Sequence, residues 1–580
     1  MSKEADRRFW AEKIADEIES REPTEPIVIK GAVSPSGSPH LGHLNEIMRG
    51  YYVAEMLRNR GYKVRQIFTS DDKDALRKLP NVLTDENWNL VSLKDIDAKA
   101  LGENLGVPYS EIPNPFNNEY KSYGDHFTAL LRESTEMIGA PVEFISTTDM
   151  YNEGMFEGVV REALQNLPLT REILNKYQKN VSKDYVPFIP QCEKCRKLTT
   201  GVKKVDMNLE LVEYECEGFA DAEGVRVSGC GHEGVATFRE GKLSWRFEWP
   251  ADWKILKIDF EPFGKDHAEG SWPSGQEIAR KIFEIEPPVP MVYEWFTLGG
   301  KALSSSKGNI VTVGDMFELV EPEIVRYFFA KNPNKQRDLD LEKIDTLVDE
   351  FDEFERAYYK ENVQKTAQVV PTEIYPIIIR ETVKKWIGKE DLEEFKLRRR
   401  IPYRFAAVLG MTNDSDLQID MATRQKLIDL EMPEWVTFLA IERVQKGRKW
   451  AEVHQNEYNY HIFGEIPDIE INEKVERALE ELACFVEEGH EGAEIQEKIN
   501  RSPNTVKIVR EKYERFNYTT VNQKQNKKLK RDKSGTQKTV PSVWSTELKP
   551  LKVSPQLATL TLVKILENQG LYPQALDILD

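Results

Sequence analysis

Two histidines three residues apart are the first side chains whose types and spacing could do chemistry. His40 and His43 lie in "SPSGSPHLGH", directly after the apolar run "PIVIKGAV". Pro39 suits a first helical position and Ser36 or Ser38 a cap, so we expect a helix that carries both imidazoles on one face. A helix start favours phosphate, and two imidazoles there could stabilise charge that develops at phosphorus. For the histidines alone, a metal pair or a solvated helix start are the alternatives.

A second candidate is the loop "GGKALSSSKGNIVTV", which is rich in glycine and serine and carries Lys301 and Lys307. Such a loop is often only a flexible linker. With two lysines it could also close over a triphosphate and neutralise the leaving pyrophosphate. The chain has no Walker-type phosphate loop, so a nucleotide here requires a different binding geometry.

A third candidate is a cluster of metal-ligating residues, formed by Cys192, Cys195, Cys216, Cys230 and His232. The spacing, one CxxC followed by a cysteine and a Cys-x-His, is typical of a zinc ribbon. Four such ligands close a tetrahedral shell, so the predicted zinc is structural rather than catalytic. The spacing leaves open whether Cys216 or His232 is the ligand, and a set of buried thiols is the alternative.

The elements that must position these groups can be read from apolar runs. Residues 26–33 indicate a buried strand, residues 43–61 a helix closed by Gly61, and residues 63–70 a second strand. Strand, helix and strand in this order predict a βαβ unit of a parallel sheet. Further strands of this sheet are expected at residues 142–146, 253–260 and 290–298. Gly42 would then leave room for a ligand at the carboxyl end of the first strand, where open α/β sheets bind ligands.

The composition sets limits on the class of protein. The chain has 580 residues, which predicts three or four domains, and 40% apolar and 31% charged residues, as in ordinary globular proteins. The net charge is −18, so any nucleic-acid site must be a local basic patch. No apolar run could span a membrane and the N-terminus has no signal core, so we expect a cytoplasmic protein with no membrane partner.

Taken together, these motifs resemble those of the class I aminoacyl-tRNA synthetases. "HLGH" at His40–His43 is similar to the HIGH motif, and "ALSSS" at Ala302–Ser306, followed by Lys307, is similar to the KMSKS loop. "SPSGSPHLGH", "DFEPFGKDH", "LSSSKGN" and "IPYRFAAVLG" narrow the resemblance to class I lysyl-tRNA synthetase. The resemblance runs from the N-terminus to about Asn500.

The resemblance implies an α/β Rossmann-type catalytic domain with a metal-binding insertion, followed by an all-helical anticodon-binding domain. The expected order is the first half of the catalytic domain (1–160), a zinc-binding insertion (161–250), the second half with the KMSKS-like loop (251–315), a helical stem and anticodon-binding domain (316–500), and a linker and tail (501–580). It also implies that lysine and ATP, with Mg²⁺, give lysyl-adenylate and pyrophosphate, and that the lysyl group then passes to tRNA(Lys).

The family pattern assigns roles to residues of this chain. The catalytic residues would be His40, His43 and Lys307. The nucleotide and pyrophosphate would be bound by Ser36, Gly42, Gly264, Asp266, His267, Ser304 and Ser306. An ammonium group of the substrate needs a carboxylate or an aromatic face. The substrate residues would be Ser34, Asp71, Asp72, Trp245 and Tyr293, with Asp71 also readable as a cap and the aromatics as core.

Three features depart from the family pattern. Ala302 and Ser305 stand where the usual loop signature has lysines, so Lys307 or Lys301 must carry the charge. "NPFNNEYKSYGDHF" lacks a Cys-His pair that some relatives use for a first metal. The chain beyond about Asn500 does not match the family's terminal helices.

Basic segments indicate where RNA could bind. "KLRRRIPYR" and "RVQKGRKW" combine arginine and lysine with aromatic residues on predicted helices, which suits phosphates and unstacked bases, although solvated helix faces look the same. The lysine-rich segment 522–539 reads as a linker, and the two short helices expected at 554–580 could bind a protein partner. A synthetase for glutamate, glutamine or arginine, and a non-catalytic tRNA-binding paralogue, are the competing interpretations.

Overall fold

The computed structural model describes residues 8–459, except for residues 97, 117–118, 180, 221–225, 304–309, 361–369, 389–391, 393–394, 396–399 and 429–432. The described residues belong to one structural unit. The expectations for the linker and tail at 501–580, and for the end of the predicted anticodon-binding domain, lie outside the described residues.

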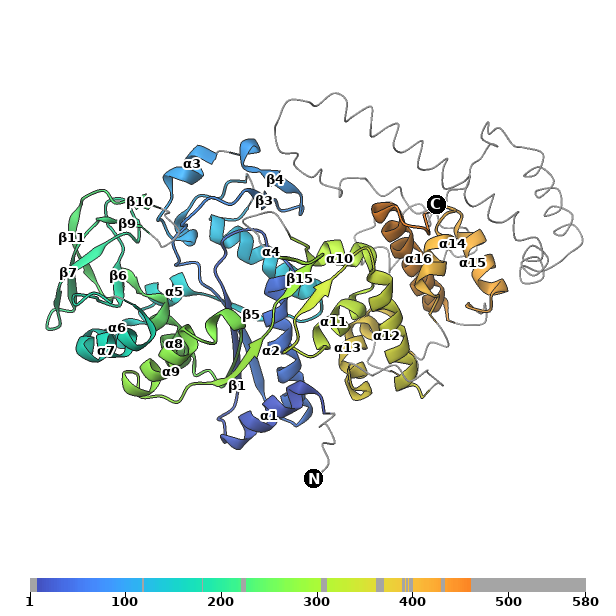
Figure 1. The fold of residues 1–580 in the computed structure, drawn as a ribbon, viewed down its shortest axis with the longest axis horizontal. Coiled ribbons are helices and arrows are strands. Elements are labelled where there is room, and N and C mark those ends of the chain that lie inside the picture. Colours follow the sequence, from blue (N-terminus) through green and yellow to red (C-terminus); the bar gives the residue numbers. More distant parts are fainter. Residues whose placement is uncertain are drawn as a thin grey trace, which may run out of the picture. The chain divides into compact units, whose positions relative to one another are not determined.

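A five-stranded parallel sheet lies at the centre of the described residues, in the order β14-β13-β1-β2-β5 (Figure 1). Its strands are β1 (Ile27–Val33), β2 (Val64–Ser70), β5 (Glu143–Ser146), β13 (Phe260–Gly264) and β14 (Val289–Tyr293). All four pairings are parallel, and β1 pairs with β2 from Ile27–Val64 to Val33–Ser70. The predicted α/β fold with a parallel sheet is therefore confirmed.

Alternate residues of the strands enter two different cores, and this explains why helices cover both faces of the sheet. Ile27 and Ile29 pack with α1 and α2, whereas Val28 packs with α6, α8 and α9 on the other face. These helices are α1 (Trp10–Ser20), α2 (Leu41–Asn59), α6 (Glu157–Gln165), α8 (Trp245–Leu256) and α9 (Ser271–Lys281). α2 is buried over most of its length because it contacts β1, β2, β13, α1 and α11. The sheet and α2 therefore form a rigid base for the first histidine motif.

Two segments extend the sheet domain between its strands. Between β2 and β5 the chain forms β3 (Val82–Thr84), β4 (Leu90–Ser92), α3 (Ala98–Glu103) and α4 (Tyr123–Met137), which enclose a small core of their own. Between β5 and β13 it forms α5 (Thr147–Asn152), α6, α7 (Leu167–Tyr177), β6 (Phe188–Pro190), β7 (Gly201–Asp206), β8 (Leu211–Glu215), β9 (Gly218–Ala220), β10 (Arg226–Ser228), β11 (Glu233–Thr237), β12 (Gly241–Leu243) and α8. Here β11, β8 and β7 form an antiparallel sheet, and β12 pairs with β6.

After β14 the described chain is mostly helical, as expected. A three-stranded sheet of β15 (Phe296–Leu298), β16 (Lys301–Ala302) and β17 (Arg337–Leu339) comes with the first of these helices. The helices are α10 (Val313–Leu319), α11 (Pro322–Ala330), α12 (Ile344–Tyr358), α13 (Tyr375–Ile387), α14 (Tyr403–Leu409), α15 (Ser415–Arg424) and α16 (Glu434–His454).

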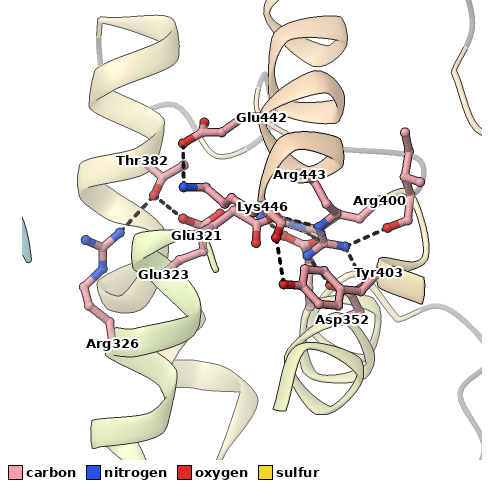
Figure 2. A network of polar contacts seen from close by, with 12 residues as sticks. Glu321, Glu323, Arg326, Asp352, Thr382, Arg400, Tyr403, Glu442, Arg443 and Lys446 are labelled. Atoms are coloured by element: carbon pink, nitrogen blue, oxygen red, sulfur yellow. Dashed lines mark hydrogen bonds and ion pairs between the residues drawn. The ribbon is translucent and has the colours of Figure 1, made fainter. Parts of the chain in front are cut away.

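Buried ion pairs join these helices (Figure 2). The side chain of Arg443 in α16 is 2% exposed, and its guanidinium lies 2.5 Å from Glu321 and 2.7 Å from Asp352. Arg400 lies 2.8 Å from both Glu323 and Glu355. A buried charge that loses its partner costs about 3–5 kcal/mol, so these pairs fix how the helices pack.

The structure therefore corrects the interpretation of "RVQKGRKW" as an RNA-facing patch. Arg443 points into the ion-pair network, and Lys446 donates a hydrogen bond to the carbonyl of Phe317 in α10. Lys449 lies 3.3 Å from Glu318. Lys446 and Lys449 therefore hold α16 against α10, and Arg443 holds it against Asp352 of α12 and Glu321 before α11.

Two predicted strands differ from the structure. The first half of residues 253–260 belongs to α8, because Trp249, Trp253 and Leu256 follow a helical spacing and pack in one core. Residues 290–298 divide into β14 and β15, which lie in different sheets. Within the described ranges, no helix combines the length and apolarity that crossing a bilayer requires.

Candidate active site

His43 stands on the first turn of α2, as predicted, whereas His40 lies one residue before the helix as its cap. The helix begins at Leu41, because the His40 ring replaces the expected serine cap: its Nδ1 accepts a hydrogen bond of 3.0 Å from Gly42 N. His43 Nδ1 accepts one of 3.2 Å from His40 N, and the two rings stack with centroids 4.0 Å apart. Ser38, a predicted cap, is buried and accepts a hydrogen bond from Thr84 Oγ1.

These contacts determine the protonation of both imidazoles. Since each Nδ1 accepts a backbone N–H, the proton of each neutral ring must be on Nε2. Burial lowers the pKa of His43 to about 4. Burial, and the neighbouring His43 ring, also hold the pKa of His40 well below its usual range. Both rings are therefore neutral at pH 7 and present an Nε2–H donor, which suits a phosphate oxygen.

Both flanks of the serine-lysine loop reach this first turn of α2. A Cβ built on Gly42 would lie 2.6 Å from the His40 ring and 3.8 Å from Leu303, the last described residue before the loop. On the other flank, the carbonyl of Val311 accepts a hydrogen bond of 2.9 Å from Leu41 N. The two flanks of the loop therefore lie beside the histidine pair, and that the loop itself shares this site stays a prediction. Ser304, Ser306 and Lys307 lie outside the described residues, and Lys301 is exposed in β16.

Three further predicted residues lie at the carboxyl ends of β1, β13 and β14. Ser34 follows β1, Gly264 ends β13, and Tyr293 ends β14. The chain connects β1 to β2 on one side, whereas β13 on its other side comes about 230 residues later, so the strand order reverses beside β1. Open parallel sheets bind ligands at the carboxyl edge of such a point, and we call this edge the crevice. Ser36 is exposed beside it, and its carbonyl accepts a hydrogen bond from Tyr123 Oη.

Aromatic side chains line the β13 side of this edge. Trp245 stacks on Trp249 with ring centroids 5.4 Å apart, and the His267 ring lies 5.7 Å from Trp245. His267 Nε2 is 3.3 Å from a carboxylate oxygen of the exposed Asp266. A Cβ on Gly264 would lie 2.5 Å from an Asp266 carboxylate oxygen, so the glycine lets this carboxylate come close to the backbone. These four predicted residues, Trp245, Gly264, Asp266 and His267, therefore lie together.

Tyr293 leads to a carboxylate that the sequence analysis missed. Its hydroxyl donates a hydrogen bond of 2.8 Å to Glu46 Oε2, and Glu46 Oε1 accepts one of 2.7 Å from Ala32 N. Burial raises the pKa of Glu46 to about 8, although its side chain is only half-buried at the crevice. The available signal was its place three residues after His43, on the same face of α2.

Asp71 and Asp72, the predicted substrate carboxylates, have other contacts. Asp72 accepts hydrogen bonds from Ser146 Oγ at 2.6 Å and Thr148 N at 2.8 Å, and so holds the start of α5. Asp71 is 6% exposed, and burial raises its pKa to about 7. Ser34 donates a hydrogen bond of 2.7 Å to Asp74, a residue that the sequence analysis passed over.

Known proteins with similar sequences decide the family. A family model described as "tRNA synthetases class I (K)" matches residues 8–376, which is more than half of the chain. The lysine–tRNA ligase of Haloarcula marismortui is 52% identical over 495 residues, covering 85% of this chain and 88% of that ligase. The chain belongs to the class I lysyl-tRNA synthetases.

Further lysyl-tRNA synthetases agree with this assignment. The lysine–tRNA ligase of Natronomonas pharaonis is 53% identical over 83% of this chain and 86% of that protein. The lysine–tRNA ligase of Pyrococcus horikoshii is 30% identical over 84% of this chain and 89% of that protein. The predicted resemblance is confirmed, and a synthetase for another amino acid or a non-catalytic paralogue is not favoured.

This class I lysyl-tRNA synthetase also carries a compact thiol cluster in its antiparallel insertion. The four ligand atoms are the sulfurs of Cys192, Cys195, Cys216 and Cys230, which lie within 4.8 Å of one another. The Cys192–Cys230 and Cys195–Cys216 sulfur pairs are 3.7 Å and 3.6 Å apart. Zinc–sulfur bonds of about 2.3 Å in a tetrahedron place sulfurs about 3.8 Å apart, so the four thiols fit zinc. The open choice between Cys216 and His232 falls to Cys216, because His232 Nε2 lies 2.7 Å from Glu193 instead.

Proposed function

We propose that this chain activates L-lysine with ATP and transfers it to tRNA(Lys) through lysyl-adenylate. In the first step a lysine carboxylate oxygen attacks the α-phosphorus of ATP, a new P–O bond forms, and the bond to pyrophosphate breaks. In the second step a hydroxyl at the tRNA 3′ end attacks the lysyl carbonyl carbon and AMP leaves. The observation that carries this proposal is that the histidine pair, both loop flanks and the Glu46–Tyr293 pair border one edge of the sheet.

The phosphates would lie at the start of α2. His40 and His43 donate from Nε2, and the helix dipole adds to their attraction for the charge that grows at the phosphates. Lys307, with Ser304, Ser306 and Lys301, would hold the pyrophosphate from the loop side. Because the imidazoles are neutral and fixed by backbone bonds, they need no reorganisation during the displacement. Mg²⁺, when bound to ATP, supplies further charge neutralisation.

Glu46 is our candidate acceptor for a substrate ammonium. An ammonium that enters the crevice would bring Glu46 to its ionised form, and Tyr293 Oη holds that carboxylate in place. Trp245 would offer an aromatic face from the β13 side of the same edge, and His267 and Asp266 would border the nucleotide. Glu46 thus takes the role that the sequence analysis gave to Asp71 and Asp72.

The charges behind the crevice favour lysine over glutamate. Six carboxyl groups surround two lysine ammonium groups there: Glu46, Asp71, Asp74, Glu248, Asp252 and Glu261 around Lys30 and Lys242. The carboxyl groups outnumber the lysines. Burial raises the pKa of Glu248 and of Asp252 to about 7, so these two carboxyl groups are only partly ionised without a further cation. A cationic substrate completes the charge balance, and an acidic one would worsen it.

The remaining expectations complete the proposal. The insertion would bind one structural zinc through its four cysteines, the helical region after residue 316 would contact tRNA, and the protein would act in the cytoplasm. The domain limits stay as predicted from the sequence. A protein partner for the tail also stays a prediction.

The test is ATP–pyrophosphate exchange, with and without tRNA, for lysine, arginine, glutamate and glutamine. Lysine should support exchange at least about 100-fold better than the others, a ratio that about 2.7 kcal/mol of differential binding provides. Exchange with another amino acid at an equal rate, or none with lysine although tRNA binds, would reject the proposal.

A further inference from the structure

Lys242 connects the metal-binding insertion to the crevice. It lies in β12, opposite Ile189 of β6, and β6 leads directly to the first cysteine pair. Its side chain is 6% exposed, yet it comes from the insertion and not from the central sheet. Its ammonium donates to Asp74 and lies 2.7 Å from Glu248.

The contacts continue from Lys242 to Ser34 on the rim of the crevice. Asp74 uses one oxygen for Lys242 and the other for the hydroxyl of Ser34, which donates to it at 2.7 Å. On the far side, Glu248 accepts a hydrogen bond of 3.0 Å from Tyr151. The ammonium is therefore fixed from two sides and cannot turn without breaking a buried ion pair.

The charge on Asp74 decides whether the Ser34 hydroxyl donates a hydrogen bond to a ligand or accepts one from it. Burial alone would raise the pKa of Asp74, but Lys242, with smaller help from the Ser34 hydroxyl and Arg77, outweighs burial and the pKa falls below its usual value. The other charged groups that act on Asp74 or Lys242 are Arg77, Asp71, Glu248 and Lys73. An ionised Asp74 can only accept, so the Ser34 proton points at Asp74 and the oxygen lone pairs remain for a ligand.

We propose that Lys242 is a positioning residue for the amino-acid site, because through Asp74 it makes the Ser34 hydroxyl an acceptor for an ammonium group of lysine. This inference rests on the proposed function. With Lys242 absent, a protonated Asp74 could donate to Ser34, whose own proton would then face the substrate cation. The insertion would in this way contribute to lysine binding without touching lysine.

The test is Lys242→Met, which keeps the length of the side chain and removes its charge. We expect the KM for lysine in pyrophosphate exchange to rise about tenfold, with the KM for ATP unchanged within about twofold, because one hydrogen bond to a charged group is lost. Lys204→Met is the matched control: Lys204 lies in β7 of the same insertion, 3.0 Å from Glu213, with a 61% exposed side chain. It should leave both constants unchanged.

A double-mutant cycle separates positioning from general damage. Ser34→Ala should raise the KM for lysine by a similar factor, and Lys242→Met added to it should change the KM by less than about twofold, because both act through one hydroxyl. If Lys242→Met does not fold, the double variant with Glu248→Gln replaces it, because it removes one charge of each sign. The double variant should show the same rise in the KM for lysine.

Two outcomes would overturn the inference. An unchanged lysine KM in a folded Lys242 variant, or full additivity with Ser34→Ala, contradicts it and leaves the proposed function intact. Wild-type protein without lysine-dependent exchange rejects the proposed function, and this inference with it.

Discussion

Tyr293 Oη donates a hydrogen bond of 2.8 Å to Glu46 Oε2, although 247 residues separate the two in the chain. This bond joins the end of β14 to α2 at the rim of the crevice. It fixes a half-buried carboxylate at this edge of the sheet.

Glu46→Gln should weaken lysine binding strongly, because the variant keeps the shape of the side chain and loses its charge. We expect the KM for lysine to rise about 30-fold or more, which corresponds to a lost charged hydrogen bond of about 2 kcal/mol. The measurement is pyrophosphate exchange with varied lysine. Tyr293→Phe is the graded control, with a rise of about threefold, since Glu46 keeps its bond from Ala32 N. An unchanged KM in Glu46→Gln would remove Glu46 from the substrate site.

The pH dependence of lysine use should follow Glu46. Burial raises its pKa to about 8, so the free protein gains the ionised form as the pH rises through that value. Between pH 7 and 8.5, kcat/KM for lysine should increase about eightfold, since it reports the free enzyme. His43, with a pKa of about 4, stays neutral over this range and does not contribute. The same increase in Glu46→Gln would contradict this explanation.

His43→Asn should separate the phosphate donor from the helix cap. The asparagine oxygen can still accept the hydrogen bond from His40 N, but no group replaces Nε2–H. We expect kcat for exchange to fall by about 10²–10³, while the melting temperature changes by less than about 2 °C. His454→Asn, at the end of α16, is the control and should keep full activity. Loss of fold with loss of activity would point to a structural role.

Metal content should distinguish the four-cysteine set from one that includes His232. Purified protein should contain about one zinc per chain, and Cys216→Ser should lower this content and the melting temperature. His232→Ala should retain the metal, because His232 contacts Glu193. Elemental analysis of both variants decides this, and zinc loss in His232→Ala would contradict the assignment.

The sequence predicted what depends on local patterns. The apolar runs located β1, α2 and β2, and the position of His40 and His43 at the end of β1 followed from the order of strands and helices. Residues 253–260 were misread because their apolar residues fit a short strand as well as a helix. Local patterns cannot show which distant residue a side chain will meet.

Long-range pairs are therefore what the sequence analysis missed. Glu46 has no recognisable role until its contact with Tyr293 is known. The same holds for Lys242 and Asp74, which are 168 residues apart in the chain. The same reason explains Arg443, whose charge suggested RNA until Glu321 and Asp352 appeared opposite it. Buried charge pairs are a property of the folded chain, and no spacing rule predicts them.

The most direct test is a crystal structure of the protein with a non-hydrolysable lysyl-adenylate analogue. We predict an ammonium nitrogen of the analogue within about 3.2 Å of a Glu46 oxygen, and a phosphate oxygen within about 3.2 Å of Nε2 of His40 or His43. A phosphate bound away from the start of α2, or both ammonium groups bound away from Glu46, would contradict the account.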